Sequence, residues 1–183
     1  MAQQNEVVFA GFGGQGVMTA GQLLAYTAMD EGKHVCWIPS YGPEMRGGTA
    51  NCTVVVSDKR IGSPIINNPY SACVFNRPSL DKFGALIRPK GLLLINSSLI
   101  DVNSGRDDVE EFLVPANDLA IKVGNPKVAN IIMLSAYVEI TQIIKFKSLK
   151  DMLTKKLGQK KDLLEINYAA LEEGRKLAKK AVK

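Results

Sequence analysis

The feature that most constrains the fold is a glycine-rich turn near the start of the chain, between an apolar run and a stretch of small residues. Residues 7–10 form a short β-branched and aromatic run, and Gly11, Gly13 and Gly16 follow it with the spacing G-x-G-x-x-G. Glycine allows a sharp turn and a close backbone approach to a ligand, and the start of a helix offers unpaired N–H groups to an anion. The spacing predicts a strand–turn–helix that either holds a pyrophosphate or only makes a tight turn.

The elements after the turn complete a β-α-β unit. Residues 15–30 place small and apolar side chains at helical spacing, and residues 34–38 read as a second buried strand. Such a unit predicts that strands one and two are parallel with a right-handed crossover. Residues 39–49, with two prolines and three glycines, predict an irregular loop at the carboxyl end of the second strand. Because ligands of open α/β sheets sit at that end, we expect this loop to lie beside the glycine-rich turn.

The rest of the chain predicts further strands and then helices. Apolar runs and turn residues indicate strands at 51–57, 61–66 as its hairpin partner, 72–75, 92–95, and 111–115 at the sheet edge. Periodicity and cap residues indicate helices at 78–87, at 126–144, from a capping box at 148–151, and at 161–181. The predicted fold class is α/β: a Rossmann-like, mostly parallel sheet flanked by helices, with a helical C-terminal part, in one domain over residues 1–183.

One predicted helix is apolar on nearly all sides. From Asn130 to Ile144 the helix has few polar positions, so it is expected to be buried in a core or under a partner subunit. A chain of 183 residues has limited room to enclose such a helix, which favours assembly with other subunits. In the final helix, Leu163, Ile166, Ala170, Leu177 and Ala181 are predicted to face inward.

The positive charge is concentrated at the C-terminal end. Residues 145–183 carry 12 Lys or Arg and 5 Asp or Glu, a net charge of +7, whereas the whole chain has +5. The two interpretations are a solvated helical face and a docking surface for an acidic partner. Nucleic acid is disfavoured, because no nucleic-acid motif and no interleaved aromatic residues accompany the lysines.

Several classes of protein are disfavoured by what the sequence lacks. The start shows no secretory signal, and the longest apolar run, residues 131–144, is too short to span a membrane and contains polar residues, so we expect a cytoplasmic protein. Cys36, Cys52 and Cys73 have no cluster-ligand spacing, and His34 is the single histidine, so no metal site is predicted.

The candidate site lacks the groups of a self-contained enzyme. A dinucleotide fold carries an acid at the end of strand two, but Ile38-Pro39-Ser40 stands there and Glu44 is the nearest acid. Arg46 could meet a phosphate instead. With one histidine and no paired carboxylates, no catalytic residue is predicted. The two loops therefore resemble half of an active site, and an independent NAD(P)- or FAD-binding oxidoreductase stays as an alternative.

Three ordered motifs together resemble one family. They are G-F-G-G-Q-G at 11–16, P-S-Y-G-P-E-M-R-G-G-T-A-N at 39–51, and G-N-P-K-V-A-N at 124–130. The chain resembles the gamma subunit of 2-oxoacid:ferredoxin (acceptor) oxidoreductases over nearly its whole length. The R-G-G-T-A-N segment is similar to the 2-oxoglutarate branch of that family.

The resemblance implies a multisubunit enzyme. It would oxidatively decarboxylate 2-oxoglutarate with coenzyme A to succinyl-CoA and pass electrons to ferredoxin or another acceptor. Thiamine diphosphate and the iron–sulfur clusters would be held by thiamine-binding alpha and beta subunits and a ferredoxin-like delta subunit. This chain would contribute to assembly, with coenzyme A as its one candidate ligand. A purely structural scaffold subunit is the remaining alternative.

The resemblance also implies residue roles. The phosphate-facing residues would be Gly11, Gly13, Gly14, Gln15 and Gly16, with Arg46 forking onto a phosphate or an interface carboxylate. The residues facing partner subunits would be Tyr41, Gly42, Glu44, Gly47 and Gly48. Asn125 and Asn130 would fix the start of the buried helix and belong to the same interface.

Overall fold

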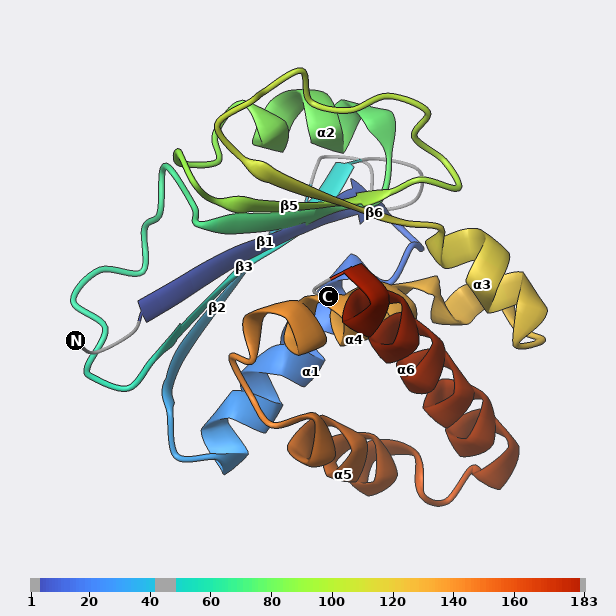
Figure 1. Cartoon of the computed structure of the whole chain (residues 1–183). Helices are drawn as coiled ribbons and strands as arrows, with labels where there is room; N and C mark the ends of the chain where they lie inside the picture. Colours follow the sequence, from blue (N-terminus) through green and yellow to red (C-terminus); the bar gives the residue numbers. More distant parts are fainter. Residues whose placement is uncertain (1–3, 42–48, 182–183) are drawn as a thin grey trace.

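The computed structural model describes residues 4–41 and 49–181, and its centre is a six-stranded sheet (Figure 1). The strands follow the spatial order β2-β3-β1-β4-β5-β6. Their bounds are β1 Gln4–Phe12, β2 His34–Tyr41, β3 Thr49–Ser57, β4 Ser71–Val74, β5 Leu92–Asn96 and β6 Glu110–Val114. The helices are α1 Val17–Asp30, α2 Arg77–Gly84, α3 Ala116–Lys122, the 3₁₀ helix η1 Pro126–Val128, α4 Ala129–Thr141, α5 Phe146–Leu157 and α6 Lys161–Ala181.

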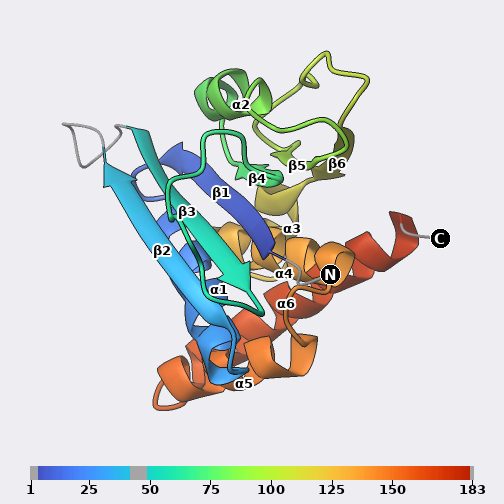
Figure 2. The same cartoon turned by 90° about the vertical axis from the view of Figure 1, so that its left-hand side faces the viewer.

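The sheet is mostly parallel, as predicted, but one strand runs against the others. β1, β4, β5 and β6 are parallel, while β3 is antiparallel to both β1 and β2. Strands β1 and β2 therefore point the same way without touching, because β3 lies between them. The predicted parallel direction of the first two strands is confirmed, although β3 separates them. Figure 2 shows β2 and β3 side by side at the edge of the sheet.

The predicted hairpin between 51–57 and 61–66 is wrong. Residues 61–66, all within the described part, form no strand. Strand β3 has no edge left for them: β1 pairs with it from Gln4↔Ser57 to Phe12↔Thr49, and β2 pairs with it on the other side. The predicted loop at 39–49 is likewise shortened, because β2 continues through Tyr41 and β3 begins at Thr49.

The sheet has a helical layer on each face (Figure 1). Side chains alternate along β1, so Val7 and Phe9 join the large core with α1, α4 and α6, whereas Val8 and Ala10 join the smaller core under α2. Both cores are closed, with these four side chains at most 3% exposed. In the described part of the chain, no helix is long and apolar enough to cross a bilayer.

Helix α4 is buried inside this chain. Ten successive residues, Ala129 to Val138, are buried between the sheet and α6. Tyr137 lies edge-on to Phe9, and its hydroxyl is 3.1 Å from that of Ser71. Gly174 of α6 allows the close approach, because a Cβ there would lie 2.3 Å from the Ile132 carbonyl oxygen. Burial of this helix is confirmed, but its own chain covers it, so it no longer argues for a partner subunit.

Several helix ends differ from the prediction. Helix α5 begins at Phe146 instead of at a capping box at 148–151, because the Glu31 carboxylate accepts the Lys145 N–H at 2.7 Å and satisfies the helix start. Helix α2 ends at Gly84, three residues early. Leu163, predicted inward, is 38% exposed. Helix α3 has no counterpart among the predicted elements.

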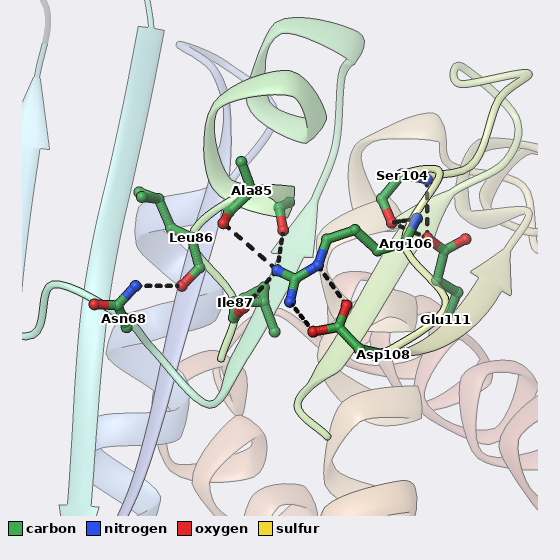
Figure 3. A network of polar contacts seen from close by, with 9 residues as sticks. Asn68, Ala85, Leu86, Ile87, Ser104, Arg106, Asp108 and Glu111 are labelled. Carbon is green, nitrogen blue, oxygen red and sulfur yellow. Dashed lines mark hydrogen bonds and ion pairs between the residues drawn. The ribbon is translucent and has the colours of Figure 1, made fainter. Parts of the chain in front are cut away.

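The long connection between β5 and β6 is held by Arg106 (Figure 3). Its Nη1 donates to the carbonyl of Gly84, the last residue of α2, at 3.1 Å and to that of Ile87, three residues further on, at 2.5 Å. Its Nε and Nη2 form a two-pronged pair with Asp108, which lowers the pKa of that carboxyl from its usual value. A positive group at the end of a helix is favourable, so one arginine ties this connection to α2.

The close contact between α4 and α6 gives a stability prediction. Gly174→Ala is expected to lower the free energy of unfolding by about 1–3 kcal/mol, because the new methyl group meets backbone atoms of α4. In an isolated helix, replacing glycine by alanine would stabilise the helix by about 1 kcal/mol. The sign of the change in the free energy of unfolding therefore shows whether α4 and α6 are in close contact. Urea denaturation followed by circular dichroism measures it. Gly62→Ala, where a Cβ meets nothing within 4 Å, is the matched control and is expected to be near neutral.

Candidate functional site

The glycine-rich turn closes on itself and then opens helix α1. The Gln15 N–H donates to the Phe12 carbonyl at 3.1 Å, and the Phe12 N–H donates to Gln15 Oε1 at 2.6 Å. Gly14 and Gly16 have φ values of 100° and 76°, which favour glycine. Gly16 is the N-cap of α1, and no side chain in the described part caps that end. The first N–H groups of α1 are therefore available to an anion.

Two of the predicted phosphate-facing residues also serve packing. A Cβ at Gly11 would lie 2.6 Å from Gln15 Oε1 and 3.0 Å from Phe75 Cβ, so glycine is required there for close contact. The Gln15 side chain donates to the Phe75 carbonyl at 3.2 Å and accepts from Asn76 at 3.3 Å. The Gln15 side-chain amide therefore holds the turn on the side of Phe75 and Asn76. The backbone of the turn lines a groove.

A groove of about 330 Å³ runs along the turn and joins two of the motifs. It is lined by Phe12, Gly13, Gly14, Gly16, Val17, Met18, Thr19, Tyr41 and Ala50. Tyr41 is 58% exposed at the end of β2. The predicted proximity of the first and second motifs is thus found at Tyr41 and Ala50. The other residues predicted in the second loop, Gly42, Glu44, Arg46, Gly47 and Gly48, lie outside the described residues.

The third motif meets the first through Asn130. Its Nδ2 donates to the Gly16 carbonyl at 3.1 Å across a separation of 114 residues. A Cβ on Gly16 would lie 2.5 Å from that nitrogen, so the contact also requires a glycine. Asn125 accepts the Lys127 N–H at 2.9 Å and begins the 3₁₀ helix η1, which leads directly into α4. The two asparagines therefore hold the start of the buried helix, and their predicted place in an interface with partner subunits stays a prediction.

Two further asparagines at this edge of the sheet were not predicted. Asn76 follows β4, caps α2 by accepting the Ser79 N–H at 2.9 Å, and reaches Gln15. Asn96 ends β5, donates to Asn117 at 2.8 Å and accepts the Ala116 N–H at 3.2 Å. Both are at most 5% exposed. The available signal was an asparagine directly after a buried strand, at the edge where ligands of such sheets bind.

Two of the three thiols are poor nucleophiles, and the described residues form no metal centre. Burial raises the pKa of the Cys52 thiol to about 11 and raises that of Cys73 as well, so both thiols stay protonated and unreactive at neutral pH. Within the part of the chain that the structure describes, no three His, Cys, Asp or Glu residues form a group that could hold a metal ion. The groove presents backbone N–H groups suited to an anion, and its described lining holds no carboxylate, imidazole or thiol.

The bond between Asn130 and Gly16 gives the second prediction. Asn130→Asp replaces an N–H donor by an oxygen facing the Gly16 carbonyl, and is expected to cost about 1–3 kcal/mol of stability. Hydrogen exchange at residues 14–19 should quicken in the same variant. Asn67→Asp, at an exposed position, is the matched control. Equal stability and exchange in the two variants would contradict the role given to Asn130.

Comparison with known proteins places the chain among oxidoreductase subunits. Residues 6–177 match the family described as pyruvate ferredoxin/flavodoxin oxidoreductase. The ketoisovalerate oxidoreductase subunit VorA of Methanothermobacter marburgensis is 39% identical over 95% of this chain, which spans 36% of that relative's length. The 2-oxoglutarate synthase subunit KorC of Methanocaldococcus jannaschii is 31% identical, with 96% of this chain and 95% of the relative covered.

Solved structures agree in fold. The gamma subunit of a keto/oxoacid ferredoxin oxidoreductase from Geobacter sulfurreducens has a TM-score of 0.82 at 27% identity, covering 95% of this chain and 98% of that one. A 2-oxoglutarate:ferredoxin oxidoreductase from Magnetococcus marinus has a TM-score of 0.88 at 22% identity, covering 97% of this chain and 31% of that one. The resemblance to gamma subunits is thereby confirmed, and the chain belongs to the pyruvate ferredoxin/flavodoxin oxidoreductase family.

Proposed function

We propose that this chain is the gamma subunit of a coenzyme A-dependent 2-oxoacid:acceptor oxidoreductase. The observation that carries the proposal is a groove between the first and second motifs. It offers the backbone N–H groups at the start of α1, and its described lining holds no carboxylate, imidazole or thiol. The reaction would convert a 2-oxoacid, coenzyme A and two oxidised ferredoxins into an acyl-CoA, CO₂, two reduced ferredoxins and a proton. The groups that carry carbon and electrons would lie on thiamine-binding alpha and beta subunits and a ferredoxin-like delta subunit.

The three cysteines of this chain do not suit an iron–sulfur cluster. Cys36, Cys52 and Cys73 are free thiols, and Cys52 and Cys73 are buried in the core. A cluster needs several thiolates converging on one point. The role left to this chain is to bind and orient a substrate and to contact its partners.

Coenzyme A is the ligand that we propose for the groove. A pyrophosphate suits the open start of α1, where Gly14 and Gly16 bring the backbone close and the helix dipole favours negative charge. Arg46, from the segment between Tyr41 and Thr49, would add a guanidinium that can fork onto a phosphate. The related fold from Magnetococcus marinus was solved with 2-oxoglutarate, coenzyme A and succinyl-CoA bound, which supports the choice of ligand.

We propose 2-oxoglutarate as the 2-oxoacid, on the strength of the R-G-G-T-A-N segment at 46–51. A branched-chain substrate, ketoisovalerate, is the second candidate, because the VorA relative is 39% identical and the KorC relative 31%. The pocket that chooses between them would lie on the thiamine-binding subunits.

The sheet order weakens the alternative of an independent NAD(P) or FAD enzyme. In a dinucleotide fold the ribose is held by an acid at the end of the strand next to the first one. Here β3 occupies that place and runs in the opposite direction. The carboxyl end of β2 is occupied by Ser40 and Tyr41, which are not acids.

The first functional prediction concerns turnover. The isolated chain should show no acyl-CoA formation from 2-oxoglutarate and coenzyme A with a viologen acceptor. The complex co-purified with its partner subunits should turn over, with a kcat/KM for 2-oxoglutarate about tenfold or more above those for ketoisovalerate and pyruvate. Activity of the isolated chain, or micromolar NAD(P) or FAD binding by it, would contradict the proposal. A preference for ketoisovalerate would overturn only the choice of substrate.

The second functional prediction separates coenzyme A binding from a scaffold role. In the complex, Arg46→Ala should raise the KM for coenzyme A about tenfold and leave the KM for the 2-oxoacid within about twofold, because one charge-assisted contact is lost. Arg60→Ala, at an exposed position at the far end of β3, is the matched control. A scaffold role predicts an unchanged KM for coenzyme A with weaker assembly.

A further inference from the structure

A second hollow lies on the other side of the glycine-rich turn, away from β2. It has a volume of about 310 Å³ and is enclosed by α1, α5, α6 and the start of α4. Its apolar lining consists of Leu23, Val128, Ile131, Leu153, Leu157 and Leu163. We call it the leucine cleft. Leu163, which was predicted to face the core, is instead 38% exposed beside it.

Positive charge surrounds the leucine cleft. Residues 145–161 contain seven lysines and one aspartate. Among the described residues, Lys145, Lys150, Lys156, Lys160 and Lys161 form no ion pair within 4.0 Å, whereas Lys147 and Lys155 do. Lys127 and Lys156, both exposed, line the cleft itself. We call Lys155, Lys156, Lys160 and Lys161, around the turn between α5 and α6, the lysine turn.

The cleft and the lysine turn form one continuous surface. Lys155, Lys156, Leu157, Gly158, Gln159 and Lys160 line a shallower hollow of about 390 Å³. Lys156 and Leu157 belong to both hollows. Helices α1, α5 and α6 lie together on the face of the sheet opposite α2 (Figure 1). An apolar centre with a charged rim is the usual anatomy of a protein–protein interface.

The chemistry of this surface fits carboxylates better than nucleic acid. Its cations are all lysines, which act as point charges and do not form the two-pronged contacts that arginine makes with phosphate. The two nearby rings are covered: Lys156 Nζ lies 4.1 Å from the centre of the Tyr26 ring, and Lys150 Nζ lies 4.7 Å from that of Tyr168. Those rings are therefore not free to stack on bases, which single-stranded nucleic acid requires.

We propose that the leucine cleft and the lysine turn dock an acidic surface of a partner subunit, which inserts an apolar side chain into the cleft. The inference rests on the proposed function, because the partner is a subunit of the same complex. Gly16 and Thr19 line both the leucine cleft and the groove beside the glycine-rich turn. The docked subunit therefore abuts the coenzyme A groove and can place its own reactive groups next to it.

Charge reversal tests the lysine turn. The double variant Lys156→Glu and Lys160→Glu should weaken binding to the purified partner subunits about tenfold or more at about 50 mM NaCl, and should flatten the dependence of the dissociation constant on salt. Lys59→Glu with Lys82→Glu makes the same change in net charge at exposed positions away from this surface. This control should bind within about twofold of the wild type. Circular dichroism of each variant verifies that it folds.

A second pair of variants tests the leucine cleft. Leu163→Asp should weaken binding at all salt concentrations, because it removes the apolar contact. Leu86→Asp is the matched control, because Leu86 is 37% exposed and Leu163 is 38% exposed. This variant should bind the partner subunits as tightly as the wild type does. Wild-type affinity in both the lysine and the leucine variants would overturn this inference alone, as would a raised KM for coenzyme A with unchanged subunit affinity. Failure of the wild-type chain to bind the subunits would instead overturn the proposed function, and this inference with it.

Discussion

The bond from Asn130 to the Gly16 carbonyl joins the two parts of the chain that everything else surrounds. Gly16 ends the glycine-rich turn and opens α1, and Asn130 stands in the first turn of α4, the helix at the centre of the large core. The contact leaves no space for a side chain at Gly16, whose backbone is also left-handed. Two requirements, conformational freedom and close approach, therefore meet at one glycine. The position of α4 determines that of α6, which packs on α4 through Gly174. The bond between Asn130 and Gly16 also determines the shape of the groove, because Gly16 lines it.

Most elements of the fold could be predicted from local pattern, whereas their order in the sheet could not. Periodicity located all six strands and the long helices to within a few residues. It did not reveal that β3 would enter between β1 and β2, because a buried strand has the same apolar pattern whichever neighbours it has. The false hairpin at 61–66 has the same cause: nothing local states that both edges of β3 are already paired. Helix α3 is too short for a periodic signal, and it is held by Asn96 from another strand.

Within the candidate site, the sequence located the residues better than their roles. The glycines at 11, 14 and 16 share one motif, yet Gly11 is needed for packing against Phe75, and Gly14 and Gly16 for left-handed backbone. Gln15 turns its amide to the β4–α2 junction. Asn76 and Asn96 follow buried strands, a signal that was available, but their contacts with Gln15 and Asn117 join segments that are distant in sequence and that no spacing encodes. The all-apolar helix was correctly expected to be buried, but which surface covers it depends on the position of α6.

The distribution of polar groups gives the strongest physical reason to regard this chain as part of a larger site. Its groove supplies oriented backbone dipoles and holds no carboxylate, imidazole or thiol among its described lining residues, which suits it to holding an anion. Beside Gly16 the surface changes to leucines rimmed by lysines. Among the described residues, Lys156, Lys160 and Lys161 form no ion pair within 4.0 Å, whereas Lys155 pairs with Asp30. Unpaired like charges close together repel one another, and a subunit that brings carboxylates relieves that repulsion. One turn thus separates a surface suited to a small anion from one suited to a protein, which is the arrangement that a site completed by a second subunit requires.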